Sequence, residues 1–258
     1  MTKIYVLTDN HAQREFKAEW GLSFFIETGG TSILFDFGDS DLFLKNAAKL
    51  GIDPLSAEHY VLSHGHWDHG NGLQYMPSRK LVCHPEVFIK RYRGKKYLGL
   101  PYSHEEAEQK FDLVLTASPY RISENAFFLG EITRQFDFED IINDFVKEDG
   151  SMDPVVDDSG IVLTGDKGLI VISGCAHAGI CNTVEHAKAV TGVNKVQAVL
   201  GGFHLKGGDK QCAETISYLK GLNAEYISTS HCTQFPALVE FANELGSRPF
   251  MAGQIIEL

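Results

Sequence analysis

The sequence predicts an α/β protein built as one large domain. Its 258 residues suit a single domain of this class, and 43% of them are hydrophobic while 22% are charged. Short β-branched and aromatic runs are frequent near the start of the chain. From residue 160 onward, apolar strand patterns alternate with helix patterns, which indicates strands joined by helical connections.

The first part of the chain is rich in strands. The predicted strands share β-branched and aromatic residues and cover 3–8, 23–27, 32–36 and 60–62. Ser40 is predicted to cap a helix that continues to about Leu50 and is stopped by Gly51. A further helix is predicted to begin near Gly70 or Asn71, with its positive N-terminal end beside the preceding loop.

The middle of the chain, about 84–155, has a different character from the rest. It is rich in aromatic and charged residues, and no hydrophobic period persists in it. A capping box predicts a helix at 104–110. Apolar runs predict strands at 113–116 and 126–129. We interpret this region as a cap or insertion within a single domain that covers 1–258.

The second half alternates between strands and helices. Strands are predicted at 160–164, 169–173, 197–200, 226–230 and about 249–257. Helices are predicted at 181–190, 209–221 and 236–245. His177, His204 and His231 each follow one of these strands within a few residues.

The loop Ser63–Gly72 carries the densest group of reactive side chains. His64 and His66 are two positions apart, so in an extended segment both face one point, while Asp68 and His69 diverge toward a second. Imidazole and carboxylate groups are ligands for zinc, iron or manganese. The alternative is a solvated polar loop, but the adjacent glycines and the position at a strand end favour a metal-binding loop.

Four histidines follow the carboxyl ends of apolar strands, where the loops of α/β sheets form ligand sites. These are His64, His177, His204 and His231, and their convergence predicts a metal site. The role of His204 stays open between a ligand, a substrate-binding or acid/base group, and a structural residue.

Two residues outside these loops are further candidates for the site. Asp36 ends a predicted strand and is either a carboxylate that orients a ligating histidine or a turn or capping residue. His11 follows the first strand and is a candidate for lining the substrate pocket.

Charge and cysteine usage limit the class of protein. The formal net charge is −11, which argues against a general binder of nucleic acid or anionic membranes. Five cysteines without a C-x-x-C pair predict reduced thiols and a cytoplasmic protein. We expect no signal peptide and no membrane span. The expected partner is a small-molecule substrate, and the sequence is compatible with a homo-oligomer.

A basic, aromatic cluster covers 90–97 in this otherwise acidic chain. Arg91 and Arg93 within it are candidates for binding a phosphorylated substrate or stacking on a heterocycle. The alternative is a solvated helix end or loop.

The motif H-x-H-x-D-H, present at residues 64–69, resembles the signature of the metallo-β-lactamase superfamily. The resemblance implies an αββα sandwich, in which two mixed β-sheets are flanked by helices and metals bind at one edge. The later segments "GCAHAGICNT", "GGFHL" and "SHCT" resemble the branch named for 7,8-dihydropterin-6-methyl-4-(β-D-ribofuranosyl)aminobenzene-5′-phosphate synthase.

The resemblance implies one or two divalent metal ions, zinc first, with manganese or iron as alternatives. The first metal is expected on His64, His66 and His177, and the second on Asp68, His69 and His231. The superfamily's bridging aspartate has no clear counterpart, because Cys175 stands at the corresponding strand end. This thiol is a metal ligand, a spectator or a packing residue.

The resemblance further implies a hydrolase that uses a metal-activated water on an ester, lactone, thioester or phosphoester. Asp68 is expected to orient the water, and His204 is the candidate for proton transfer. The alternatives are a dihydropterin-type synthase that condenses two substrates with loss of a phosphate-type leaving group, an iron-dependent redox enzyme, and a non-catalytic metal-binding protein.

Overall fold

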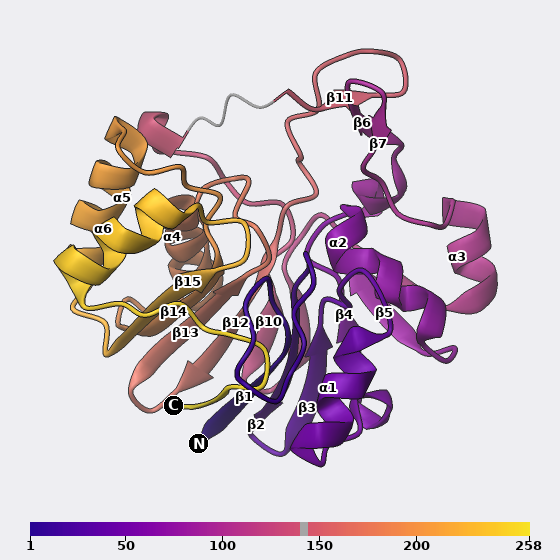
Figure 1. Cartoon of the computed structure of the whole chain (residues 1–258), viewed down its shortest axis with the longest axis horizontal. Helices are drawn as coiled ribbons and strands as arrows, with labels where there is room; N and C mark the ends of the chain where they lie inside the picture. Colours follow the sequence, from indigo (N-terminus) through magenta and orange to yellow (C-terminus); the bar gives the residue numbers. More distant parts are fainter. Residues whose placement is uncertain (140–143) are drawn as a thin grey trace. The chain divides into compact units, whose positions relative to one another are not determined.

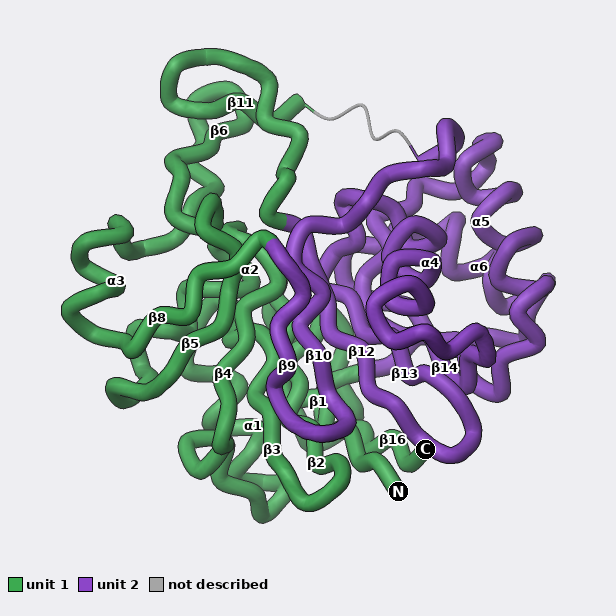
Figure 2. The backbone as a smooth tube through the Cα atoms, turned by 180° about the vertical axis from the view of Figure 1, so that it is seen from behind, with its two compact units in different colours: residues 1–117, 142–157, 251–258 green, residues 118–141, 158–250 purple. Residues whose placement is uncertain are grey.

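The computed structural model of the chain describes residues 1–139 and 144–258. They fall into two compact units, drawn in different colours in Figure 2. Apart from the residues not described, unit 1 comprises Met1–Ala117, Ile142–Asp157 and Met251–Leu258, and unit 2 comprises Ser118–Ile141 and Asp158–Phe250.

Unit 1 contains a seven-stranded mixed sheet with the order β16-β1-β2-β3-β4-β5-β8. Its strands are β1 Thr2–Thr8, β2 Ser23–Thr28, β3 Thr31–Phe35, β4 His59–Val61, β5 Lys80–Cys83, β8 Asp112–Leu115 and β16 Ile255–Glu257. Neighbours from β16 to β3 are antiparallel, whereas β3, β4, β5 and β8 run parallel. The carboxyl ends of β3 and β4 therefore meet at one edge of this sheet.

Helices cover part of this sheet (Figure 1). The helical segments of unit 1 are α1 Leu42–Leu50, η1 Pro54–Ser56, α2 Trp67–Gly70, η2 Asn71–Tyr75, η3 Pro85–Phe88 and α3 His104–Lys110. The apolar face of α1 buries Phe43 and Ala47 in a cluster with Leu34 and Tyr60. This burial removes apolar surface from water and holds α1 against the sheet.

A small second sheet in unit 1 has the order β11-β6-β7. Its strands are β6 Arg91–Arg93, β7 Lys96–Tyr97 and β11 Val146–Lys147. The range 84–155 supplies these strands and also β8, β9 and β10 of the large sheets, while 140–143 lie outside the described residues. The interpretation of this range as a cap or insertion in a single domain stays a prediction.

Unit 2 contains a six-stranded mixed sheet with the order β15-β14-β13-β12-β10-β9. Its strands are β9 Tyr120–Ser123, β10 Ala126–Phe128, β12 Gly160–Gly165, β13 Gly168–Ser173, β14 Val196–Gly202 and β15 Tyr226–Ser230. Strands β13, β14 and β15 are parallel, so their carboxyl ends lie at one edge.

The helices of unit 2 follow the parallel strands, as Figure 1 shows. They are η4 Asp137–Glu139, α4 Ile180–Thr191, α5 Lys210–Gly221 and α6 Phe235–Leu245. Their buried faces share one hydrophobic cluster with the sheet, in which Val184, Ile216 and Phe241 meet Val171 and Val199. This connection of parallel strands through packed helices is the βα alternation that the sequence predicts.

The observed elements confirm the predicted class of two mixed sheets flanked by helices. Three predictions of local structure need correction. The helix expected at Gly70 begins at Trp67, because His66 is the extended residue that precedes its first turn. The cap of α1 is Asp41, although the Ser40 hydroxyl accepts a hydrogen bond from the backbone N–H of Leu42 at 3.1 Å.

The third correction concerns the last strand, which covers only Ile255–Glu257 within the predicted range 249–257. Gly253 adopts a φ of 91°, so the preceding backbone leaves the extended conformation. The predicted elements do not include β5, β6, β7, β9 and β11, each of which has only two to four residues. Throughout the described ranges, none of the helices combines the length and apolarity that crossing a bilayer requires.

Candidate metal centre

The histidine loop of unit 1 starts where β4 ends, and its reactive side chains are buried. His64 and His69 are 0% exposed, His66 is 6% exposed and Asp68 is 7% exposed. The alternative of a solvated polar loop is therefore wrong. Burying four such groups together is costly unless hydrogen bonds or a cation compensate for the lost hydration.

Asp36 supplies part of that compensation from the end of β3. Its carboxylate accepts hydrogen bonds from the backbone N–H and from the hydroxyl of Ser63, both at 2.8 Å. The same carboxylate lies 2.6 Å from Nδ1 of His69. This contact is the one expected of a carboxylate that orients a ligating histidine, a role that stays a prediction. It leaves Nε2 of His69 as the nitrogen available to a metal.

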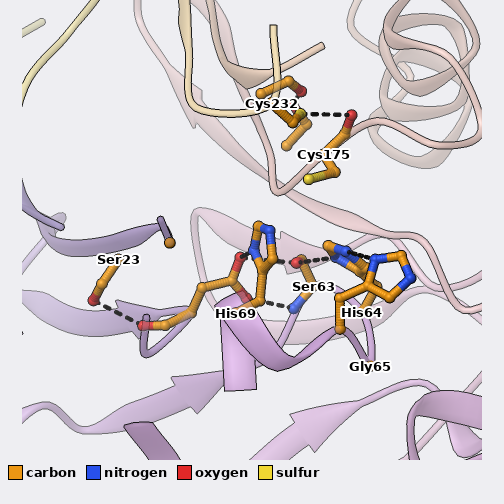
Figure 3. Close-up of polar contacts among 12 residues, drawn as sticks. Ser23, Ser63, His64, Gly65, His69, Cys175 and Cys232 are labelled. Atoms are coloured by element: carbon orange, nitrogen blue, oxygen red, sulfur yellow. Dashed lines mark hydrogen bonds and ion pairs between the residues drawn. The ribbon is translucent and has the colours of Figure 1, made fainter. Parts of the chain in front are cut away.

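His64, labelled in Figure 3 beside Ser63 and His69, directs a ring nitrogen at a ring nitrogen of His66. Nε2 of His64 lies 2.9 Å from Nδ1 of His66, while Nδ1 of His64 is held 2.9 Å from the Ser63 hydroxyl. The ring centroids of His64 and His69 are 4.2 Å apart. Three imidazoles thus share one small buried volume, and this donor set suits a divalent metal such as zinc.

The backbone of the loop is fitted closely to its surroundings. A Cβ atom on Gly65 would lie 1.9 Å from the carbonyl oxygen of Val87, so only glycine fits there. The Gly65 N–H donates to Asp157 at 2.8 Å. Because α2 begins at Trp67, Asp68 and His69 occupy successive positions of a helical turn instead of the extended segment from which the sequence prediction was made.

Unit 2 carries its own group of potential ligands at the carboxyl ends of β13, β14 and β15. Cys175 and His177 follow β13, His204 follows β14, and His231 follows β15. Cys175, His177 and His231 are 3%, 1% and 4% exposed, and His204 is partly buried. The parallel register of the strands is what gathers these residues at one edge.

The backbone at this edge is strained. Ala176, His204 and His231 adopt φ values of 51°, 50° and 54°, which are unusual for residues other than glycine. Such conformations persist where surrounding contacts impose them, and they are concentrated at functional sites. One such contact is next to His204, where the N–H of the preceding residue, Phe203, donates to the Thr233 hydroxyl at 3.0 Å.

Within unit 2, His204 lies between a histidine and two cysteines. Its ring centroid is 4.4 Å from that of His177. The ligand atoms of Cys175, His204 and Cys232 all lie within 4.8 Å of one another. Burial by itself raises the pKa of the Cys232 thiol, but hydrogen bonds with Cys175 and His204 outweigh it and hold that pKa well below its usual range.

Cys232 is a residue of this group that the sequence prediction did not select. The signal available in the sequence was its position next to His231, at the end of a predicted strand. No local pattern relates it to Cys175, because the two are 57 positions apart in the chain.

Arg91 does not lie on a basic surface. Its guanidinium is 0% exposed and forms ion pairs with Asp153 at 3.2 Å and Asp157 at 2.8 Å. The prediction of a solvated loop is wrong for this residue. A substrate phosphate would have to displace two buried carboxylates, so the structure gives Arg91 a role inside unit 1 in place of the expected substrate contact.

Arg93 and His11 are accessible. The Arg93 side chain is 51% exposed, pairs with Asp144 at 2.7 Å, and lies over the ring of Phe145 with 4.7 Å between guanidinium carbon and ring centroid. The Phe145 ring in turn contacts His66, with 5.0 Å between centroids. His11 is exposed, and its backbone N–H donates to Asp9.

The chain belongs to the metallo-beta-lactamase superfamily, whose sequence model matches residues 21–231. The superfamily typically binds divalent metals, and the described residues include groups of histidine, cysteine and aspartate that could hold one. The predicted family is thereby confirmed.

Two curated relatives come from Methanocaldococcus jannaschii. The chain is 33% identical to the 7,8-dihydropterin-6-methyl-4-(beta-D-ribofuranosyl)-aminobenzene-5′-phosphate synthase, over 99% of this chain and 96% of the relative. It is also 33% identical to an uncharacterized protein of the same organism, over 93% of each chain.

A solved structure described as a metal-dependent hydrolase of the beta-lactamase superfamily is 31% identical in sequence. It matches with a TM-score of 0.89 over 100% of this chain and 99% of that one. This similarity confirms the fold over the whole chain.

Proposed function

We propose that the protein is a metal-dependent hydrolase that cleaves an ester, lactone, thioester or phosphoester. The observation that carries the proposal is the buried array of His64, His66 and His69 with the carboxylate of Asp36 behind it. An array of this kind fits a metal better than it fits any packing role. The solved relative described as a hydrolase supports the same class of reaction.

The proposal assigns the ligands as the sequence predicts them. His64, His66 and His177 hold a first divalent ion, and Asp68, His69 and His231 hold a second ion where one is present. Zinc suits imidazole and carboxylate donors, and manganese or iron are the alternatives.

A bound divalent ion would supply a water molecule activated for attack and would stabilise negative charge on the substrate. Asp68, in the first turn of α2, would accept a hydrogen bond from such a water and orient it toward the electrophilic atom. His204 transfers a proton to the leaving group, a role that an imidazole can perform because one ring nitrogen can carry a proton while the other accepts one. Asp36 keeps the proton of His69 on Nδ1 and so holds its ring in place.

The proposed substrate is a small molecule that carries a phosphate, processed in the cytoplasm. Arg93 is the group we propose for the phosphate, because it is accessible and lies over Phe145, which contacts His66. A guanidinium recognises phosphate oxygens through paired N–H groups. The five cysteines are all free thiols, which supports a reducing compartment.

The test combines metal analysis with a substrate screen. Protein purified without added metal is analysed for bound ions, loaded with zinc or manganese, and assayed on phosphoesters, lactones, thioesters and simple esters. We expect turnover of at least one class, reduced more than about 100-fold in His66→Ala and Asp68→Ala. The control is His104→Ala on α3, whose ring pairs with Glu108 at 3.3 Å.

Three outcomes would contradict the hydrolase. Turnover that persists in both variants does not belong to this site. Protein that binds no metal would contradict the metal site itself. A single tightly bound iron would favour the redox alternative.

A second candidate is a synthase, favoured by the similarity to the dihydropterin synthase over 99% of the chain. A condensation consumes two organic substrates and releases a phosphate-type group, whereas hydrolysis consumes water. Reaction in isotopically labelled water separates them, because the label enters the cleaved product only in hydrolysis. Release that requires a second organic substrate and incorporates no label would favour the synthase.

A further inference from the structure

We propose that unit 2 contains a thiolate metal site formed by Cys175, His204 and Cys232. It is distinct from the histidine and carboxylate ligands assigned above, and it would take a thiophilic ion of the zinc class. The three ligand atoms lie within 4.8 Å of one another, and all three residues belong to one compact unit. The inference therefore stands without the proposed function.

The strand ends bring these side chains together. Cys175 follows β13, His204 follows β14 and Cys232 follows β15, and the three strands are parallel neighbours. The Cys232 thiol lies against the segment after β13, where it donates to the carbonyl oxygen of Cys175 at 3.6 Å (Figure 3). Residues as far apart as 175 and 232 thus meet at one point.

Gly202 leaves the space that the second thiol occupies. A Cβ atom at this position would lie 2.6 Å from Sγ of Cys232 and 2.6 Å from the carbonyl oxygen of Gly174. The Gly202 N–H donates to that same carbonyl at 3.0 Å, and the Ser173 hydroxyl donates to the Gly202 carbonyl at 3.0 Å. These bonds hold the ends of β13 and β14 at a fixed separation, which is what a preformed ligand set needs.

The donor chemistry indicates the class of ion. Two sulfurs and one imidazole form a three-ligand set that zinc accepts, with a fourth position left for water or substrate. The remaining cysteines are placed differently, because Cys83, Cys181 and Cys212 are buried within the hydrophobic clusters of the two units. Ligation would engage the same His204 imidazole that the proposed hydrolase uses for proton transfer.

The test uses cobalt(II) as a spectroscopic substitute for zinc. The full chain is freed of metal by chelation, kept under a non-thiol reductant, and titrated with cobalt(II) chloride. We expect a sulfur-to-cobalt charge-transfer band in the near ultraviolet. It should lose roughly half of its intensity in Cys232→Ser and in Cys175→Ser, and all of it in the double variant, because each sulfur contributes one bond.

Cys212→Ser is the matched control, since it removes a buried thiol outside the site and should leave the band unchanged. His204→Gln should weaken the affinity for cobalt(II), measured by titration of the charge-transfer band, because it removes one ligand and keeps both sulfurs. Absence of the band in the unaltered protein would overturn the site, and so would a band that survives in the double variant. In either case the thiols only pack against each other.

The experiment also separates this inference from the proposed function. Cobalt(II) bound by imidazole and carboxylate ligands gives visible d–d bands but no sulfur-to-cobalt charge-transfer band. If the protein turns over a substrate and shows only the d–d bands, the thiolate site is overturned and the proposed function is not. Charge transfer without turnover of any screened substrate would contradict the hydrolase and leave the thiolate site standing.

Discussion

Asp36 connects two parts of the histidine loop through one carboxylate. It follows β3 in a left-handed conformation with a φ of 58°, which an aspartate adopts more readily than most residues. The conformation is held by the backbone: the Asp36 N–H donates to the Val61 carbonyl, and its own carbonyl accepts from the Ser23 hydroxyl. Fixed in this way, the carboxylate contacts both Ser63 and His69.

Replacing Asp36 with asparagine tests this positioning role. The amide keeps the shape but loses the charge that orients His69, so we expect metal affinity to fall about 10- to 100-fold. Isothermal titration with zinc measures the loss. The matched control is Asp41→Asn, since the Asp41 side chain is 37% exposed and pairs with Lys45. Equal affinity in the Asp36 variant and the unaltered protein would contradict the role.

Arg91 and Arg93 show how two arginines of one short strand differ in environment. Arg91 is enclosed with Asp153 and Asp157, whereas Arg93 pairs with Asp144 at the surface. Removing one member of a buried ion pair leaves an uncompensated charge, while an exposed pair contributes little because water already solvates both partners.

We therefore expect Arg91→Met to lower the free energy of unfolding by about 3–5 kcal/mol and Arg93→Met by less than about 1 kcal/mol. Urea denaturation of both variants measures this difference. If Arg93 binds phosphate as proposed, Arg93→Met should weaken binding of phosphorylated ligands far more than of neutral esters. Equal effects on both ligand classes would remove Arg93 from the proposed site.

At the scale of elements, α4 depends on a carboxylate from outside the helix. Gly179, which precedes the helix at the capping position, provides no side-chain cap. Glu139 instead accepts hydrogen bonds from the N–H groups of Cys181 at 2.8 Å and Asn182 at 2.7 Å. A Cβ on Gly179 would collide with that carboxylate. The negative charge also lies at the positive end of the helix dipole.

Burial raises the pKa of Glu139 above its ordinary value of 4.5, although the backbone N–H groups oppose the shift. Because the folded state binds this proton more tightly than the unfolded state, the contribution to stability is fully present below about pH 4.5 and is lost as the pH rises through the folded pKa.

Glu139→Gln removes this titration. The unfolding free energy of the unaltered protein minus that of the variant should fall as the pH rises from 4.5 toward neutrality. Urea denaturation at a series of pH values measures it, with the exposed Glu124→Gln as the comparison. A difference that rises over this range would show that the N–H groups outweigh burial.

At the scale of the whole molecule, each unit has its own hydrophobic cluster and its own group of potential ligands. In unit 1 the ligands follow β4, and in unit 2 they follow β13, β14 and β15. A metal that binds only the folded chain stabilises it by mass action, since the unfolded chain has no assembled ligand set.

Metal loading should therefore raise the unfolding free energy of the whole chain. With free zinc at 100 times its dissociation constant, we expect a gain of about 2.7 kcal/mol over protein kept in chelator. Urea denaturation in both conditions measures the gain, and His66→Ala should reduce it. An unchanged denaturation midpoint would contradict metal binding by the folded state.

Much of the fold was predictable because strands and helices are encoded by local periodicity. The helix at 104–110 matches α3, and the predicted ranges of the second half match β12 to β15 and α4 to α6 within two residues. The placement of His64 and His177 after strands was predictable for the same reason. Short strands such as β7, with two residues, contain too little pattern to be found.

The sequence by itself determined most strands, the helices that follow the parallel strands, and the histidine loop, since each depends on residues close together in the chain. The two mixed sheets were expected only from the resemblance of the histidine motif to the superfamily. Only the tertiary structure decided that Arg91 pairs with Asp157, that Glu139 caps α4, and that Cys232 meets Cys175. These contacts join residues between 42 and 66 positions apart. Strand order and register bring such partners together, and neither is a property of any local segment.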